Sequence, residues 1–236
     1  PTLFEAIHSQ QFKRELTGND KTRIALCICS CMMYLHSLSL INYDLHPQNI
    51  IFPEKGFPQL TNFGLKPLNK YFPNLNKEPF HPHQWMPPEI YQNSPISPKS
   101  DVYSFGIILW EIYTQHFPLG NVKPENYHEK VIVKQERPII PIETPKTLKK
   151  LMELCWHPDP EKRPSFKQIY QLFVTGRVQF ENTDKSVIDE IVKIVDDFQQ
   201  KIKPPPKEFK NISDIPAFFK TAKVNEIYEY TQGLNE

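Results

Sequence analysis

The sequence has few glycines, no long hydrophobic run and almost no net charge, and each of these features excludes a class of protein. None of its seven glycines lies in a G-x-G-x-x-G arrangement, so a glycine-rich phosphate loop of that type is missing. No apolar run approaches the roughly 18 residues that a membrane-spanning helix needs. The 28 basic and 27 acidic residues nearly balance, so charge alone recruits neither nucleic acid nor a membrane.

The four cysteines predict neither disulfides nor a metal site. Cys27, Cys29 and Cys31 fall within one apolar helical pattern, where buried thiols are common, and Cys155 stands apart. Cys27 and Cys31 share a helix face, but no His or Cys follows at a ligand spacing. We therefore expect a reducing, cytoplasmic compartment. The chain starts without Met or a secretory signal pattern, which suggests a gene fragment or a trimmed product.

Hydrophobic periodicity predicts a mainly helical globular domain with an appendage. Helical patterns occur at 3–12, 22–36, 101–113, 125–134, 145–155 and 166–173. Ser100 or Asp101 is expected to cap the nearly all-apolar helix at 101–113. Short apolar pieces at 38–41, 50–52 and 59–60 predict small strands and turns. The segment 66–84, rich in Pro, Asn and Lys, is interpreted as a surface loop.

The pattern changes after residue 176. Residues 184–202 carry apolar side chains at alternating spacings of three and four, which predicts a helix that packs along its length. Only about two heptads are present, so docking onto the preceding domain is favoured over a coiled coil. Residues 203–207 form a stiff proline-rich spacer. The last thirty residues hold enough apolar side chains for two short helices, to which no function is assigned.

The most informative pattern is Asp44 followed five residues later by Asn49, with the triplet Asn62-Phe63-Gly64 downstream. A carboxylate can accept a proton, and an amide oxygen can bind a metal ion. Taken alone, Asp44 reads as a turn residue and Asn49 as a strand-edge residue.

Further motifs follow in a fixed order. Trp85-Met86-Pro87-Pro88-Glu89 precedes Ser100-Asp101-Val102-Tyr103-Ser104-Phe105-Gly106 with Trp110, and Arg163 closes the segment 155–164. Singly, these residues read as surface charges, a helix cap and core filling. Their order and spacing together make chance an inadequate explanation.

The ordered set resembles the C-terminal lobe of a protein kinase of the tyrosine-kinase-like group, over residues 1–175, with 176–236 as a helical extension. The resemblance implies a mainly α fold with short β-hairpins around the catalytic loop, and no N-terminal β lobe. It also implies ATP and Mg²⁺ as cofactors, with binding by this chain alone in doubt. Asp44 would be the base, Asn49 and Asn62 the metal ligands, and Ile51 the residue below the adenine.

Four residues are expected to support the fold. The resemblance pairs Glu89 with Arg163, and places Asp101 against the backbone of the catalytic loop, with Trp110 in the same central helix. A buried pair such as Glu89–Arg163 is strongly destabilising to break from one side.

The chain departs from the family at its charges. Asn62 stands where a metal-binding Asp is usual, and His46, mostly neutral near pH 7, replaces a Lys near the transferred phosphoryl group. Tyr43 replaces the Arg that grips a phosphorylated loop. Two unit charges at about 4 Å attract each other by roughly 4 kcal/mol when the effective dielectric is near 20, and each neutral replacement removes one such attraction to the metal ion or the phosphoryl group. This corresponds to about three decades in rate.

These observations leave three functional hypotheses open. The first is a catalytically impaired pseudokinase that acts by binding protein partners. The alternative is a Ser/Thr protein kinase whose N-terminal lobe lies upstream, with Asp44, Asn49 and Asn62 in catalytic roles. A third is an interaction module whose helix at 184–202 binds a partner. None of the three predicts a nucleic-acid or membrane partner.

Overall fold

The computed structural model describes residues 1–38, 40–42, 44–53, 57–61, 83–92, 94–120 and 122–201. Asn62, Tyr43 and the proline-rich spacer lie outside these residues, as does most of the predicted loop 66–84. The predicted mainly α architecture is confirmed: one pair of two-residue strands accompanies the helices in the described part of the chain.

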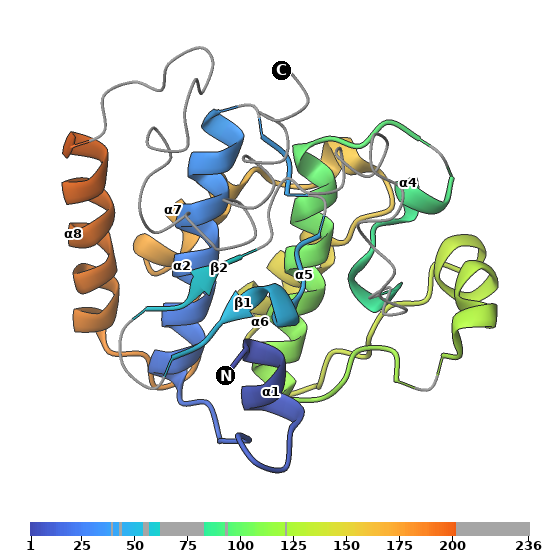
Figure 1. The fold of residues 1–236 in the computed structure, drawn as a ribbon, viewed down its shortest axis with the longest axis horizontal. Coiled ribbons are helices and arrows are strands. Elements are labelled where there is room, and N and C mark those ends of the chain that lie inside the picture. Colours follow the sequence, from blue (N-terminus) through green and yellow to red (C-terminus); the bar gives the residue numbers. More distant parts are fainter. Residues whose placement is uncertain are drawn as a thin grey trace, which may run out of the picture.

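Two long helices, α2 (Gly18–Ser37) and α5 (Pro98–Thr114), occupy the centre of the molecule (Figure 1). Helix α2 begins four residues earlier than predicted, because Thr17 and Asp20 form a reciprocal capping box around its first turn. The predicted cap of α5 was wrong. Ser97 caps this helix and Pro98 occupies its first position, where the missing N–H of proline costs nothing.

Three further helices pack around this pair. Helix α6 (Lys146–Cys155) packs on α5, whereas α7 (Phe166–Val174) and α8 (Lys185–Lys201) both pack on α2. The close approach of α6 depends on Gly106. A Cβ atom added there would lie 2.7 Å from Cβ of Cys155, so any larger residue would push the helices apart.

The chain after residue 176 shares the core of the lobe. Buried side chains from this stretch, Val178, Phe180, Val187, Ile188 and Ile191, belong to the same hydrophobic cluster as α2 and α5. The predicted docking of this helix onto the preceding domain is therefore confirmed, and Figure 1 shows α8 along the outer edge of that domain. The domain boundary at 175 stays a prediction.

Helix α1 (Leu3–His8) is shorter than the predicted 3–12 and lies beside a small β unit. Strands β1 (Ile50–Ile51) and β2 (Gln59–Leu60) pair antiparallel, with Ile50 opposite Leu60. The start of the chain joins them through a bridge between Thr2 and Ile51. This arrangement anchors the exit of the 42–49 loop against α1.

The predicted helix at 125–134 was wrong in form. A 3₁₀ turn at Pro124–Asn126 is followed by a π-helix at His128–Val133. This unit has its own small hydrophobic cluster of Leu119, Val122, Tyr127, Val131 and Ile132. The short helix α4 (Pro88–Tyr91) packs against the π-helix. Two other 3₁₀ turns lie at His83–Trp85 and Pro160–Lys162.

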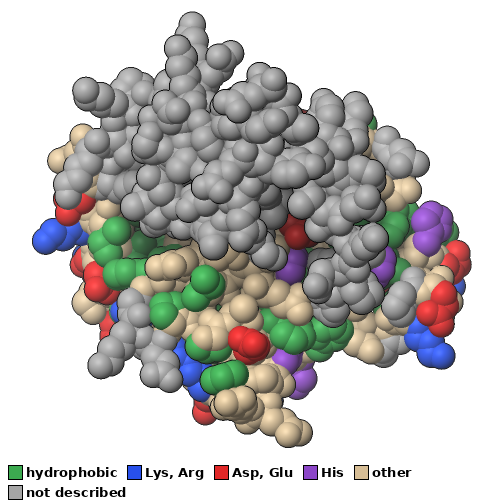
Figure 2. Space-filling model, viewed as in Figure 1, with side chains coloured by type: hydrophobic (Ala, Val, Ile, Leu, Met, Phe, Trp, Pro, Cys, Tyr) green, Lys and Arg blue, Asp and Glu red, His purple; other side chains and the backbone are tan. Residues whose placement is uncertain are grey.

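The surface mixes charges of both signs, in keeping with the net charge of +1. Figure 2 shows acidic and basic side chains side by side at the edges of the described surface. In the part of the chain that the structure describes, no helix is long and apolar enough to cross a membrane.

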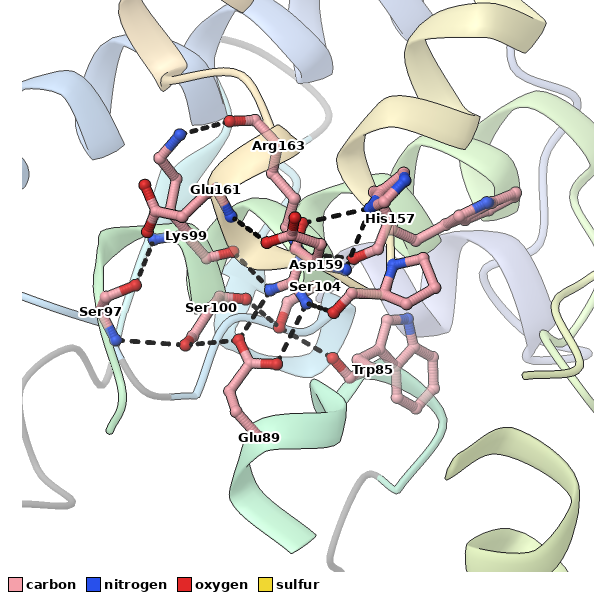
Figure 3. Close-up of polar contacts among 12 residues, drawn as sticks. Trp85, Glu89, Ser97, Lys99, Ser100, Ser104, His157, Asp159, Glu161 and Arg163 are labelled. Atoms are coloured by element: carbon pink, nitrogen blue, oxygen red, sulfur yellow. Dashed lines mark hydrogen bonds and ion pairs between the residues drawn. The ribbon is translucent and has the colours of Figure 1, made fainter. Parts of the chain in front are cut away.

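Glu89 and Arg163 form a buried ion pair that ties α4 to the segment before α7 (Figure 3). Nη1 of Arg163 donates to Oε1 of Glu89 at 2.6 Å, and Nη2 donates to Oε2 at 3.1 Å. Ser100 adds a hydroxyl donor to the same carboxylate at 2.8 Å. Burial raises the pKa of Glu89, but the bonds and charge of Arg163 outweigh it, so the pKa lies below its ordinary value.

We expect Glu89→Ala to destabilise the protein by about 3–5 kcal/mol, because it leaves the Arg163 guanidinium buried without a counter-charge. The free energy of unfolding in urea measures this. Glu153→Ala is the matched control, since Glu153 forms an exposed pair with Lys149 at 3.9 Å. Such exposed pairs contribute about 0.3–0.5 kcal/mol. Equal losses in the two variants would contradict the prediction.

The same pair predicts a pH dependence. A carboxylate whose folded-state pKa is depressed stabilises the fold above its unfolded pKa, and this contribution is lost as the pH falls through the folded value. We therefore expect the parent to lose part of its unfolding free energy below about pH 4. In Glu89→Gln this part of the acid-induced loss should be missing when both proteins are titrated in urea.

Candidate active site

The loop from Asn42 to Asn49 leads from α2 into β1. Leu45 and Pro47 are buried and hold the middle of the loop against the core. A 3₁₀ turn at Pro47–Asn49 closes it, with the amide of Asn49 donating to the carbonyl of His46 at 2.9 Å. The loop is thus fixed at both ends, which is what a positioned set of reacting groups needs.

Asp101 holds the beginning of this loop. Oδ2 of Asp101 accepts the backbone N–H of Asn42 at 2.9 Å and lies 2.8 Å from Nε2 of His36. Asp101 is 2% exposed and lies in the first turn of α5, where the helix dipole favours a negative charge. The structure therefore places Asp101 against the loop backbone, as the resemblance implied.

Asp44 and Asn49 face each other inside the loop. Nδ2 of Asn49 donates to the backbone oxygen of Asp44 at 2.9 Å and lies 3.1 Å from Oδ2 of its carboxylate. The side chain of Asp44 is 28% exposed, whereas Asn49 is buried. The amide nitrogen of Asn49 is therefore used in hydrogen bonds within the loop. Its Oδ1 atom is then the side-chain atom with the chemistry of a Mg²⁺ ligand.

His46 completes the group. Its Nε2 atom lies 2.9 Å from Nδ2 of Asn49 and 3.5 Å from Oδ2 of Asp44. An amide NH₂ group can only donate, so this contact is a hydrogen bond in the tautomer whose Nε2 atom carries no proton. Nδ1 is buried and has no hydrogen-bond partner. His46 thus presents an imidazole nitrogen to Asn49 where the resemblance implies an ammonium group.

Ile51 lies at the edge of this site on β1 and is 39% exposed, whereas its neighbours Ile50 and Phe52 are buried. An exposed apolar side chain beside the loop fits a contact with a flat ring such as adenine. Asn49 fits one oxygen ligand of a magnesium ion. The second predicted ligand, Asn62, lies outside the described residues. Among the residues that the structure describes, there is no group of three or more His, Cys, Asp or Glu that could hold a metal ion.

Trp110 supports the fold from the other end of α5. Its indole N–H donates to the carbonyl oxygen of Ile139 at 2.8 Å, and the ring is 7% exposed. Trp110 therefore ties α5 to the segment before α6 and lies away from the catalytic-loop candidate.

Sequence reasoning missed two supports of the site. His36 contacts Asp101 from α2, although 65 residues separate them, and no local spacing signals such a tertiary pair. The second is Glu111, which lies 2.7 Å from both Nε1 of Trp85 and Nε2 of His8. Burial raises the pKa of Glu111, while the bonds from His8 and Trp85 oppose this rise. In the sequence, the signal for Glu111 was the presence of an acidic residue within an otherwise apolar helical pattern.

We expect Asp101→Ala to release the catalytic-loop backbone. A hydrogen bond to a charged group contributes about 1.5–3 kcal/mol, and two donors lose their acceptor here. Hydrogen exchange at the amide of Asn42 should become faster than in the parent, and the free energy of unfolding should fall. Asp189→Ala, which removes an exposed carboxylate from α8, is the control. Unchanged exchange at Asn42 would show that Asp101 does not hold the loop.

Known proteins resemble the chain over this region. The family model for protein tyrosine and serine/threonine kinases matches residues 2–173. A probable serine/threonine-protein kinase of Dictyostelium discoideum is 35% identical over 171 residues, which cover 72% of this chain and 18% of that protein. The serine/threonine-protein kinase CTR1 of Arabidopsis thaliana is 32% identical over 173 residues, covering 72% of this chain and 21% of that protein.

A third relative is named for serine, threonine and tyrosine together. The serine/threonine/tyrosine-protein kinase HT1 of Arabidopsis thaliana is 31% identical over 181 residues, which cover 72% of this chain and 46% of that protein. The chain therefore spans less than half the length of these three relatives. The match includes the loop that carries Asp44 and the helices that brace it, so the chain belongs to the protein tyrosine and serine/threonine kinase family, within its tyrosine-kinase-like group.

Proposed function

We propose that this chain is part of a catalytically impaired protein kinase domain, a pseudokinase, that acts by binding protein partners in the cytoplasm. The hydrogen bond between Asn49 and His46 carries this proposal. In the tautomer that accepts this bond, His46 supplies no positive charge beside Asp44, whereas a Lys at this position would carry a fixed one. Phosphoryl transfer relies almost entirely on positioning and on charges that stabilise the transferred group.

A second replacement weakens the same electrostatic contribution. Asn62 offers a neutral amide oxygen where the family has a carboxylate for Mg²⁺. One missing charge pair weakens the interaction by roughly 4 kcal/mol at about 4 Å with an effective dielectric near 20. By contrast, the charges that support the fold, Glu89, Arg163 and Asp101, are all retained. This contrast favours a protein selected for its folded surface over one selected for turnover.

The alternative function is ATP-dependent phosphoryl transfer to protein hydroxyls. One observation favours it: Asp44 and Asn49 keep their mutual geometry, with Nδ2 of Asn49 on the backbone oxygen of Asp44 at 2.9 Å. This arrangement supports a role for Asp44 as the base and for Asn49 as one metal ligand. In this case Asp44 would accept the proton of the substrate hydroxyl, and Asn49 and Asn62 would hold Mg²⁺.

The two functions are distinguished by an assay of phosphate transfer, carried out with the longest protein that the gene encodes. We expect the parent and Asp44→Ala to transfer phosphate to a generic protein substrate equally slowly with ATP and Mg²⁺ or Mn²⁺. Restoring the charges with His46→Lys and Asn62→Asp should raise the rate, by up to about three decades for each lost pair. A parent that transfers phosphate well, and loses this activity in Asp44→Ala, would contradict the pseudokinase proposal.

A further inference from the structure

A groove of about 870 Å³ lies between α2, α7 and α8, and none of the residues that line it belongs to the loop from Asn42 to Asn49. Its volume lies within the range of small-molecule and peptide-binding pockets. The walls are largely apolar and include Phe57, Phe166, Ile191, Ile194 and Val195, together with the thiol of Cys27.

A polar atom inside the groove has no partner. Tyr170 lines the groove and is 6% exposed, yet its hydroxyl is buried and makes no hydrogen bond. An unpaired buried hydroxyl lowers stability, so native structures usually supply a partner. Burial raises the pKa of Tyr170 to about 12, so the group is a neutral donor that lacks an acceptor. A backbone carbonyl of a bound segment has the required chemistry.

One wall of the groove is an incompletely covered helix. Along α8, Ile188 and Ile191 are buried against the core, but Ile194, one turn further on, is 43% exposed. The apolar stripe thus continues past the surface that covers it. The chain itself goes on for 35 residues beyond Lys201, the end of α8, and therefore leaves the fold close to the groove.

The sequence beyond α8 has the matching composition. Residues 203–207 hold three prolines, a stiff spacer that extends about 3.1 Å per residue. Ile215, Phe218 and Phe219 follow at positions i, i+3 and i+4, the spacing of a single apolar helix face. A covalently attached segment has an effective concentration in the millimolar range, which favours it over a free ligand of similar chemistry.

From these four observations we propose that the groove between α2, α7 and α8 binds the chain's own segment 207–236, with the apolar face of Ile215, Phe218 and Phe219 against Ile194 and Tyr170. The proposal does not depend on whether the domain transfers phosphate. It does bear on the site, because His36 lines the groove and also contacts Asp101, which holds the catalytic-loop backbone. The bound segment would thus lie next to the support of that loop.

Photocrosslinking in the full chain tests the proposal. p-Benzoylphenylalanine is placed at Ile194, on the rim of the groove, and the protein is irradiated with an equimolar amount of ¹⁵N-labelled chain. We expect crosslinks to peptides from 207–236 of the same chain, identified by mass spectrometry. The same probe at Ile139, which is 87% exposed and lies outside the groove, gives the background. Crosslinks only to the labelled copy, or none to this segment, would overturn the proposal.

Alkylation of Cys27 supplies a second readout that needs no crosslink. Cys27 and Cys31 both line the groove, but Cys27 is partly exposed, whereas Cys31 is buried, as are Cys29 and Cys155. In Phe218→Ser/Phe219→Ser, we expect Cys27 to react about five- to thirtyfold faster with a maleimide, the factor that corresponds to one or two kcal/mol of lost docking free energy. Lys220→Ala/Lys223→Ala alters polar positions of the same segment and should leave the rate unchanged. Equal rates in both variants and the parent would refute the docking.

Discussion

The active-site geometry depends on the hydrogen bonds that the carboxylate of Asp101 accepts. A buried backbone N–H must find an acceptor, and the loop at Asn42 has no strand or helix of its own to provide one. Asp101 supplies it from the first turn of α5 and meets His36 from α2 with the same oxygen. One side chain thus joins the two central helices to the loop that carries Asp44. The contacts of Asn49 with Asp44 and His46 inside the loop depend on this anchored beginning of the loop.

The charged side chains that hold the fold differ from the residues of the candidate site in what their replacement costs. Those that hold the fold are buried and fully hydrogen-bonded, as in the Glu89–Arg163 pair, where removal of one partner leaves an uncompensated charge. At the candidate site, His46 and Asn62 stand where the resemblance implies a Lys and an Asp. A neutral replacement at a metal or phosphate site leaves no buried charge unpaired in the free protein. The fold therefore tolerates the loss of catalytic charge far better than the loss of supporting charge.

The sequence predicted the features that follow from local periodicity and from motif order. Helices α2, α5, α6 and α7 were found within a few residues, and Glu89 was matched with Arg163 across 74 positions. Asp101 was expected either to cap α5 or to hold the loop, and the structure leaves capping to Ser97. The pair Ser97-Pro98 was a readable start signal. The contacts of His36 and the π-helix at His128–Val133 depend on tertiary packing, which no spacing rule in one sequence reveals.

Little of the apolar segment next to β1 is exposed. Of the segment 50–52, only Ile51 is exposed, because the edge of β1 is occupied by Thr2 and Pro1, and Arg14 lies over the ring of Phe52 at 4.3 Å. The chain's own first residues thus cover part of this segment. Among the exposed apolar side chains elsewhere is Ile194 on α8, which continues a stripe whose first half is buried on α2. Since the groove beside that stripe is lined in part by His36, the extension after residue 176 and the catalytic-loop candidate share one structural support.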